Sequence, residues 1–113
     1  MKILVCGGRD YSDYEYLFQA LDAVNPDEIC HGGARGADEL AGAWAQSRQV
    51  KCRVFFADWA KHGKAAGPIR NKQMLDEFKP DCVIAFPGGR GTANMISQAQ
   101  KAGIPVYVQE CEC

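Results

Sequence analysis

The sequence predicts an α/β fold, in which helices on both faces of a five-stranded parallel sheet of order 3-2-1-4-5 make a three-layer domain. Five short apolar runs alternate along the chain with four segments of helical periodicity, a pattern typical of parallel strands joined by helices. Right-handed connections favour this doubly wound strand order. At 113 residues the chain is long enough for one hydrophobic core and too short for two, so we expect residues 1–113 to form one domain.

The predicted strands are apolar runs bounded by glycine, proline or polar residues. Short, nearly continuous apolar runs are typical of strands buried in a parallel sheet. Residues 60–67, by contrast, show neither periodicity nor a core face, and we expect them to be a mobile stretch. The strands are predicted at 2–6, 28–31, 52–57, 82–86 and 104–108.

The predicted helices combine apolar residues at a 3.6-residue period with residues that start or stop a helix. Ser12 or Asp13 can cap the first helix, and Asn25-Pro26 ends it. The second is rich in alanine, the third begins at Pro68, and Gly103 caps the fourth. The inward-facing apolar positions are, helix by helix, Tyr14, Leu17, Phe18, Leu21 and Val24; Ala37, Leu40, Ala41, Trp44 and Ala45; Ile69, Met74, Leu75 and Phe78; and Met95, Ile96, Ala99 and Ala102.

Composition and charge limit the kinds of partner. The formal net charge is 13 minus 14, or −1, whereas a protein that coats nucleic acid without sequence preference needs a strongly basic surface. We therefore expect no general nucleic-acid binding. Because no apolar segment reaches the roughly 20 residues that cross a bilayer, we expect no membrane partner and a cytoplasmic protein.

The six cysteines are expected to be reduced thiols. A free thiol inside an apolar run behaves as a small core residue, whereas a lone Cys-x-Cys in a polar tail lacks the spacing and partners of a zinc site. We predict neither a metal site nor a cofactor. Cys6, Cys30, Cys52 and Cys82 lie in apolar runs, and Cys111 and Cys113 lie in the tail.

The predicted binding site centres on Pro87-Gly88-Gly89-Arg90-Gly91-Thr92, which follows a strand and opens a helix. A strand that turns directly into a helix leaves free N–H groups at the helix start, where the helix dipole favours an anion. Glycines let the backbone come close to a ligand, so we expect a phosphate or a phosphate-bearing nucleotide. Thr92 can cap the helix or donate its hydroxyl to a phosphate oxygen. The alternative is a tight turn without a ligand.

Three further segments bring glycine and arginine to the same edge of the predicted sheet. Ligands of such sheets bind beyond the carboxyl ends of the strands, where the strand order reverses. Guanidinium groups recognise phosphate bidentately, so four arginines converging there favour an anion of more than one charge. The segments are Gly7-Gly8-Arg9, Gly32-Gly33-Ala34-Arg35-Gly36 and Gly67-Pro68-Ile69-Arg70-Asn71, which join Arg90.

Three side chains are candidates for chemistry or recognition at this edge. Asp38 is a candidate acid or base, although an acidic residue near a helix start also simply favours the helix dipole. His31 can titrate near neutrality, but a histidine at a strand end is more often a hydrogen-bonded structural residue. Trp59 can stack on a base, and a partly buried surface tryptophan is at least as common. Asp10, Glu39 and Asp58 are further candidate carboxylates.

Together these segments resemble the YspA-like branch of the SLOG superfamily. That superfamily also includes the Lonely guy phosphoribohydrolases, the lysine-decarboxylase-like proteins and the DNA-processing protein DprA. The resemblance implies a Rossmann-like domain that binds a nucleotide or a nucleotide-derived molecule, such as an ADP-ribose-like ligand, a nucleotide sugar or a nucleoside monophosphate. The matching segments, in order along nearly the whole chain, are 7–9, 31–38, 66–71 and the PGGxGT motif at 87–92.

The resemblance favours binding, as a sensor or processing module, over catalysis. Arg70 and Met74 match a pair in the Lonely guy enzymes, but Met95 stands where those enzymes carry a glutamate. One alternative is cleavage of a nucleotide N-glycosidic bond, with Arg70 orienting phosphate and Asp38 as acid or base. A second alternative, from the likeness to DprA, is single-stranded DNA binding, for which Trp59 and its neighbouring cations offer a fragment of a surface. Related enzymes pair into dimers, and the apolar helix faces permit a homodimer.

Overall fold

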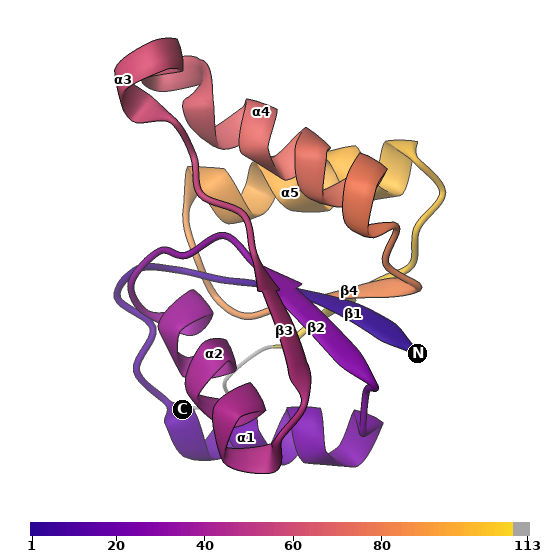
Figure 1. Cartoon of the computed structure of the whole chain (residues 1–113). Coiled ribbons are helices and arrows are strands. Elements are labelled where there is room, and N and C mark those ends of the chain that lie inside the picture. The colour runs from indigo at the N-terminus through magenta and orange to yellow at the C-terminus, as the bar shows by residue number, and fades with distance from the viewer. Residues whose placement is uncertain (110–113) are drawn as a thin grey trace.

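Five parallel strands form one sheet in the computed structural model, which describes residues 1–109 and so leaves Cys111 and Cys113 outside the described residues. The sheet order is β3-β2-β1-β4-β5, and every neighbouring pair is parallel. The predicted fold class and strand order are confirmed (Figure 1). The strands are β1 (Lys2–Cys6), β2 (Glu28–His31), β3 (Lys51–Val54), β4 (Cys82–Ala85) and β5 (Val106–Val108).

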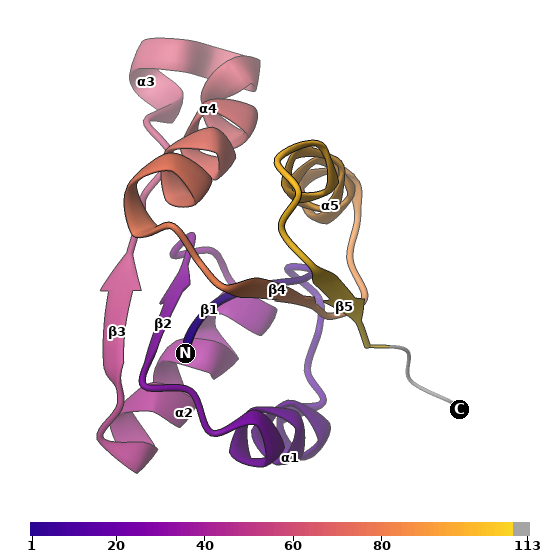
Figure 2. The same ribbon diagram turned by 90° about the vertical axis from the view of Figure 1, so that its right-hand side faces the viewer.

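Helices cover both faces of the sheet, as Figure 2 shows. The helices α1 (Tyr14–Val24) and α2 (Ala37–Arg48) lie on one face, and α4 (Ala66–Gln73) and α5 (Arg90–Lys101) lie on the other. The side chain of Asp13 caps α1 by accepting a hydrogen bond from the backbone N–H of Tyr16 (3.1 Å). No helix within residues 1–109 is long and apolar enough to cross a membrane.

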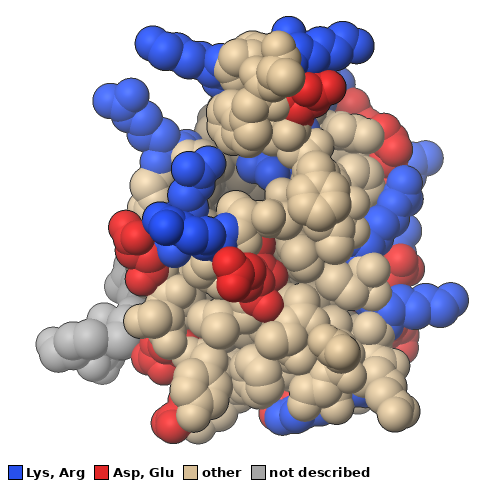
Figure 3. All heavy atoms as spheres, turned by 60° about the vertical axis from the view of Figure 1, so that its left-hand side comes forward, with Lys and Arg blue, Asp and Glu red and all other residues tan. Residues whose placement is uncertain are grey.

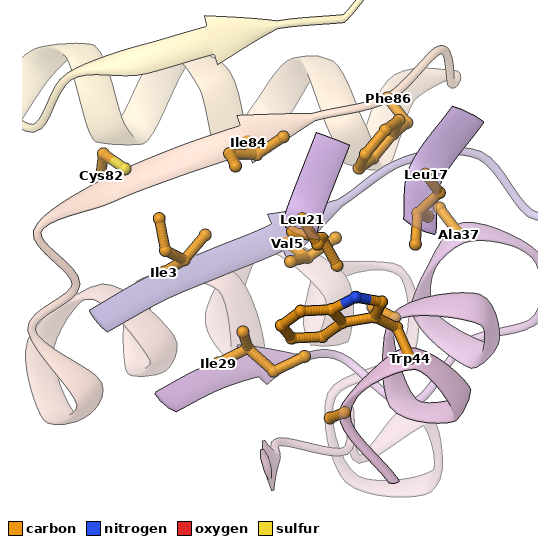
Figure 4. Close-up of a cluster of buried hydrophobic side chains, with 12 residues drawn as sticks. Ile3, Val5, Leu17, Leu21, Ile29, Ala37, Trp44, Cys82, Ile84 and Phe86 are labelled. Carbon is orange, nitrogen blue, oxygen red and sulfur yellow. The ribbon is translucent and has the colours of Figure 1, made fainter. Parts of the chain in front are cut away.

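The core has two halves because successive residues of a strand point to opposite faces. Ile3 and Val5 of β1 are fully buried against the α1 and α2 side, where they join Trp44 of α2 (Figure 4). Leu4, between them, is buried on the other side in the cluster that contains Met95 of α5. Both layers of helices are therefore anchored to the same central strand.

The segment predicted to be a mobile stretch, 60–67, is helical. A short helix, α3 (Trp59–His62), is followed by a 3-10 turn, η1 (Gly63–Ala65), and α4 then starts two residues before the predicted Pro68. Asp58 caps α3 by accepting a hydrogen bond from the backbone N–H of Lys61 (3.0 Å). A four-residue helix is too short to show periodicity in a sequence, so the sequence pattern did not indicate this helix.

Some predictions of buried side chains are wrong. Ile69 is 44% exposed, because the buried positions Gly67, Asn71 and Met74 lie three and four residues apart and leave Ile69 on the opposite side of the helix. Cys52 is exposed because β3 is an edge strand, all of whose residues are exposed. An edge strand cannot be distinguished from a central one by a short apolar run.

Other errors lie at the ends of elements, where side chains predicted to face inward are exposed and one strand is shorter than predicted. Tyr14 and Val24, the first and last residues of α1, are exposed, and so is Ala102 after α5. The strand β3 ends at Val54 rather than at 57, and Phe56 is exposed. Apolar residues at the ends of an element therefore need not be buried, even where they continue its hydrophobic pattern.

Candidate functional site

A cleft of about 1040 Å³ lies beyond the carboxyl ends of β1 and β4. The loops that follow β1, β2 and β4 form one wall and the floor, and residues of α3, η1 and α4 form the opposite wall. The strand order reverses between β1 and β4, so the cleft occupies the position where doubly wound sheets bind ligands. In Figure 3, Lys and Arg side chains gather around the hollow below the uppermost part of the molecule.

The floor of the cleft is made by glycine loops that contact each other through their backbones. The N–H of Gly8 donates to the carbonyl of Pro87 (2.8 Å), and the carbonyl of Gly8 accepts from the N–H of Ala37 (3.1 Å). A Cβ atom on Gly88 would lie 2.2 Å from Oγ1 of Thr92 and 2.6 Å from the nitrogen of Gly8. No side chain fits here, so packing within the protein itself requires glycine at position 88.

The first glycine segment, Pro87–Thr92, leaves its N–H groups unused at the start of α5. The N-cap of α5 is Gly89, and no side chain caps the helix. Within residues 1–109, no hydrogen bond is donated by the backbone N–H groups of 88–92. A Cβ atom on Gly89 or Gly91 would meet nothing within 4 Å. These N–H groups have no acceptor within the described residues, and the space beside Gly89 and Gly91 is open. This arrangement binds anions at helix starts.

The second glycine segment, Gly32–Gly36, is bonded to its own chain. Oδ2 of Asp38 accepts hydrogen bonds from the N–H groups of Gly32 (3.1 Å) and Ala34 (3.2 Å). Nδ1 of His31 accepts a third from the N–H of Gly33 (3.0 Å), so this nitrogen carries no proton and His31 is a structural residue of the loop. The two glycine segments, similar in sequence, thus differ in their free donors.

Three of the four predicted arginines line the cleft. Arg9, Arg70 and Arg90 do so, but Arg35 does not: its side chain is 72% exposed and lies 3.7 Å from the carboxylate of Asp10. The predicted convergence of four arginines is therefore wrong for Arg35, whose side chain lies at the surface beside Asp10. Arg9 instead lies over the ring of Trp59, 5.9 Å from the ring centre.

Arg70 and Asn71 join α4 to both glycine segments. Arg70 donates from Nη1 to the carbonyl of Gly32 (2.7 Å) and from Nε to Oδ1 of Asn71 (3.0 Å). Asn71 is 3% exposed, and its Nδ2 donates to the carbonyl of Gly91 (3.2 Å) and to Oδ1 of Asn94 (3.1 Å). These bonds fix the position of the Arg70 guanidinium and of the first turn of α5.

Burial sets the ionisation of the groups in the cleft. Burial raises the pKa of Asp38 to about 6, although its two backbone hydrogen bonds and the charge of Arg70 act in the opposite direction. Burial also lowers the pKa of Arg70 and, with the nearby Arg70 charge, lowers the pKa of His31. Within residues 1–109, no group of three or more His, Cys, Asp or Glu side chains is placed to hold a metal ion.

Comparisons with known proteins show the family of this chain. The model of the YspA, cpYpsA-related SLOG family (YAcAr) matches residues 1–62, which include the glycine loops at 7–9 and 32–36. This chain belongs to the SLOG family. The Gene 61 protein of Mycobacterium phage D29 is 39% identical to this SLOG chain over 117 residues, an alignment that covers 93% of each protein.

A solved structure of similar fold is the UDP-GlcNAc 2-epimerase of Neisseria meningitidis, bound to UDP-GlcNAc. The likeness covers the whole SLOG chain, with a TM-score of 0.63 and 19% sequence identity. The chain spans about a third (33%) of the length of that epimerase. At this identity the likeness concerns the fold, and it supports the three-layer α/β architecture.

The cleft of this SLOG chain contains most of the residues that the sequence predicted. Gly33, Arg35 and Gly36 do not line it. Thr92 is buried in the third position of α5 and does not cap the helix, because Gly89 is the N-cap. The predicted residues that line the cleft are Gly7, Gly8, Arg9, Gly32, Asp38, Arg70, Asn71, Pro87, Gly88, Gly89, Arg90, Gly91 and Thr92.

Sequence reasoning missed Asn94, which also lines the cleft. Asn94 lies two residues after Thr92 in α5 and bonds to Asn71, so a polar residue next to the apolar Met95 was the available signal. Lys64 of η1, which the sequence offered only as one of the cations near Trp59, also lines the cleft. Met95, at the position of the glutamate in Lonely guy enzymes, is 1% exposed and packs in the core, so it contributes nothing to the cleft.

Proposed function

We propose that this SLOG chain binds a nucleotide or a nucleotide-derived ligand in the cleft, with a phosphate group at the N-terminus of α5. The observation that carries the proposal is the row of unused N–H groups at 88–92 beside Gly89 and Gly91. Neither glycine has a positive φ, and neither is required by packing. Glycine at these positions is explained by the close approach of a ligand.

Charge supports the same proposal. Arg9 and Arg90 line the cleft, and neither forms a salt bridge with another residue of 1–109. Guanidinium groups without a carboxylate partner are available to bind phosphate. The cleft volume of about 1040 Å³ exceeds what a single phosphate needs and suits a nucleotide-sized ligand. The UDP-GlcNAc bound to the epimerase of similar fold adds nucleotide sugars to the classes to be tested.

The test is a thermal-shift screen with ADP, UDP, AMP, NAD and UDP-GlcNAc. A ligand at 100 times its Kd adds about 2.7 kcal/mol to the free energy of unfolding, which raises the Tm by several degrees in a domain of this size. Arg90→Glu reverses the charge beside the proposed phosphate and should abolish the shift. Arg35→Glu makes the same charge change outside the cleft and should retain it.

A full response in Arg90→Glu, with the variant folded, would show that the phosphate lies elsewhere. Equal losses in both arginine variants would indicate a general effect of charge rather than a contact. A short single-stranded oligonucleotide that binds and that ADP fails to displace would favour the DNA-binding alternative instead.

Hydrolysis of the nucleotide is a second candidate because of Asp38. Burial in the cleft raises the pKa of this carboxyl group to about 6, which suits a general acid near neutral pH. To test this candidate, each protein–nucleotide mixture is incubated and then separated by chromatography. Release of the free base by the wild type, but not by Asp38→Asn, would establish cleavage. The cytoplasmic location and the homodimer stay predictions.

A further inference from the structure

The two glycine segments of the cleft have different free groups to offer a ligand. The first leaves its N–H groups unused, whereas three N–H groups of the second are already bonded to Asp38 and His31. The other two N–H groups of the second segment belong to Arg35 and Gly36, which do not line the cleft. A phosphate at the second segment would meet a carboxylate and no free backbone donor. The phosphate therefore belongs at the first segment alone.

Asp38 presents an unpaired oxygen at the second segment. The residue is 6% exposed and lines the cleft. Both hydrogen bonds to its carboxylate end on Oδ2, and within residues 1–109 no donor binds Oδ1. The guanidinium of Arg70, which interacts electrostatically with Asp38, donates to Gly32 and Asn71 instead. Oδ1 is not enclosed by the protein and is open to the cleft. A ligand that donates a hydrogen bond to this carboxylate oxygen therefore gains affinity, because hydrogen bonds to charged acceptors are the stronger ones.

The spacing of the strands sets the distance between the two segments. The segments follow β2 and β4, which lie on either side of β1. Two strand spacings amount to about 10 Å. A ribose phosphate spans this distance when a hydrogen bond of ordinary length is added at the phosphate end and another at the ribose hydroxyl end. One nucleotide can therefore reach both segments.

We infer that Oδ1 of Asp38 accepts a hydrogen bond from a ribose hydroxyl of the ligand, so that the cleft selects ribonucleotides over nucleotides whose ribose lacks hydroxyl groups. The inference rests on the proposed function, because it places the phosphate at the first glycine segment. The inference goes further by assigning a ligand group, a ribose hydroxyl, to the second glycine segment. A carboxylate there accepts hydrogen bonds from hydroxyl groups and repels a second phosphate.

The test compares ADP and UDP with 2′,3′-dideoxy-ADP and 2′,3′-dideoxy-UDP by isothermal titration calorimetry at pH 7.5. A hydrogen bond to a charged acceptor that is left unmade should weaken binding roughly 10- to 100-fold. We therefore expect the dideoxy nucleotides to bind more weakly than the ribonucleotides by that factor. Adenine and uracil nucleotides are both used, so that an effect of the sugar can be distinguished from an effect of the base.

The variant Asp38→Asn separates recognition from folding. An asparagine oxygen can accept the two hydrogen bonds that Oδ2 accepts, while its NH2 group, a donor, faces the cleft. We expect ADP to bind this variant about as weakly as dideoxy-ADP, and dideoxy-ADP to be unaffected. Glu39→Gln is the matched control, because Glu39 is the exposed neighbour of Asp38 and does not line the cleft.

The pH dependence gives a second readout. The charged and titratable groups that interact with Asp38 are Arg70 of α4, Cys6 of β1 and Cys30 of β2. Burial holds the pKa of Asp38 at about 6, so lowering the pH from 7.5 to 5 protonates the acceptor. The preference for ADP over dideoxy-ADP should shrink over this range in the wild type and be absent from Asp38→Asn at both pH values.

The outcomes distinguish this inference from the proposed function. Equal affinity for ADP and dideoxy-ADP in the wild type would overturn the inference and leave phosphate binding intact. An unchanged ribose preference in Asp38→Asn would overturn the role of Asp38. If no nucleotide binds the wild type at all, the proposed function fails, and the inference fails with it.

Discussion

At the scale of single residues, Asp38 holds its carboxylate in a place with little water. Two backbone N–H groups favour the charged form, but burial is the larger effect and raises the pKa to about 6. A carboxyl group whose pKa is higher in the folded than in the unfolded protein binds protons more tightly when folded. Protonation of Asp38 therefore stabilises the fold.

We predict that Asp38 makes the protein less stable as the pH rises. Its contribution is fully present below pH 4, near the unfolded pKa, and is lost as the pH passes through about 6. The difference of about two pKa units corresponds to roughly 3 kcal/mol. Urea unfolding at pH 4 and pH 7.5 should show this loss in the wild type relative to Asp38→Asn. Parallel pH profiles of the two proteins would contradict the prediction.

Individual residues of the cleft were predictable where the sequence carries the constraint locally. Glycine beside arginine after an apolar run indicated the loops at 7–9 and 87–92, and both line the cleft. The same pattern at 32–36 gave a wrong expectation for Arg35. The bonds from this loop to Asp38 and His31 depend on how the loop folds back, which a pattern of residue types does not contain.

At the scale of elements, the start of α5 contains two kinds of glycine. Gly88 is enclosed by Thr92 and Gly8, whereas Gly91 faces open space in the first turn of the helix. The first kind serves the packing of the protein, and the second serves the cleft. Substitution by alanine separates the two roles.

We predict opposite effects on stability for Gly88→Ala and Gly91→Ala. Gly88→Ala places Cβ 2.2 Å from Oγ1 of Thr92 and should lower the free energy of unfolding by about 1–3 kcal/mol. Gly91→Ala removes a flexible residue from a helix and should raise it by about 0.5–1 kcal/mol. Urea unfolding measures both, and the Gly91 variant should nevertheless lose the thermal shift with ADP.

The control for Gly91→Ala is Ser97→Ala, an exposed position later in α5 that does not line the cleft. This variant also favours the helix and should keep the full response to ADP. A normal ADP response in Gly91→Ala would mean that the space at the helix start is not used by the ligand.

The strands and long helices were predictable because their periodicity is local, and right-handed connections then fixed the order of the sheet. The elements that escaped prediction are α3 and η1, whereas the predicted third helix does continue to Phe78, its last five residues forming a π-helical turn, η2 (Met74–Phe78). The two unpredicted elements span four and three residues. Hydrophobic patterns cannot resolve elements of that length.

At the scale of the whole molecule, the two halves of the core protect three thiols. Cys6, Cys30 and Cys82 are buried, whereas Cys52 is exposed on the edge strand β3. Burial raises the pKa of the Cys6 thiol to about 12, so this thiol stays protonated as well as enclosed. Cys6 lines the cleft, whereas Cys30 is fully buried, so reaction of Cys30 requires the sheet and its helices to separate.

We predict that Cys52 reacts faster than Cys30 with a thiol reagent in the native protein and that Cys30, which is fully buried, reacts at the rate of global unfolding. The measurement uses a variant with Cys111→Ser and Cys113→Ser, so that the tail does not contribute. Saturating ADP should slow the labelling of the buried thiols and leave Cys52 unchanged. Rapid native-state labelling of Cys30 would show that the sheet opens locally.

The backbone contacts between the loops at Gly8, Pro87 and Ala37 have a consequence for how this protein can diverge. A Cβ atom added at Gly8, Gly36 or Gly88 would lie 2.9 Å or less from neighbouring atoms of these loops, so side chains at the floor of the cleft are tightly restricted. A change in ligand preference must instead come from substitutions of side chains that line the cleft above its floor, such as Arg9, Trp59 and Arg90. We therefore expect homologues to keep the same glycine loops at the floor of the cleft, while the side chains around the cleft vary with the ligand that each homologue binds.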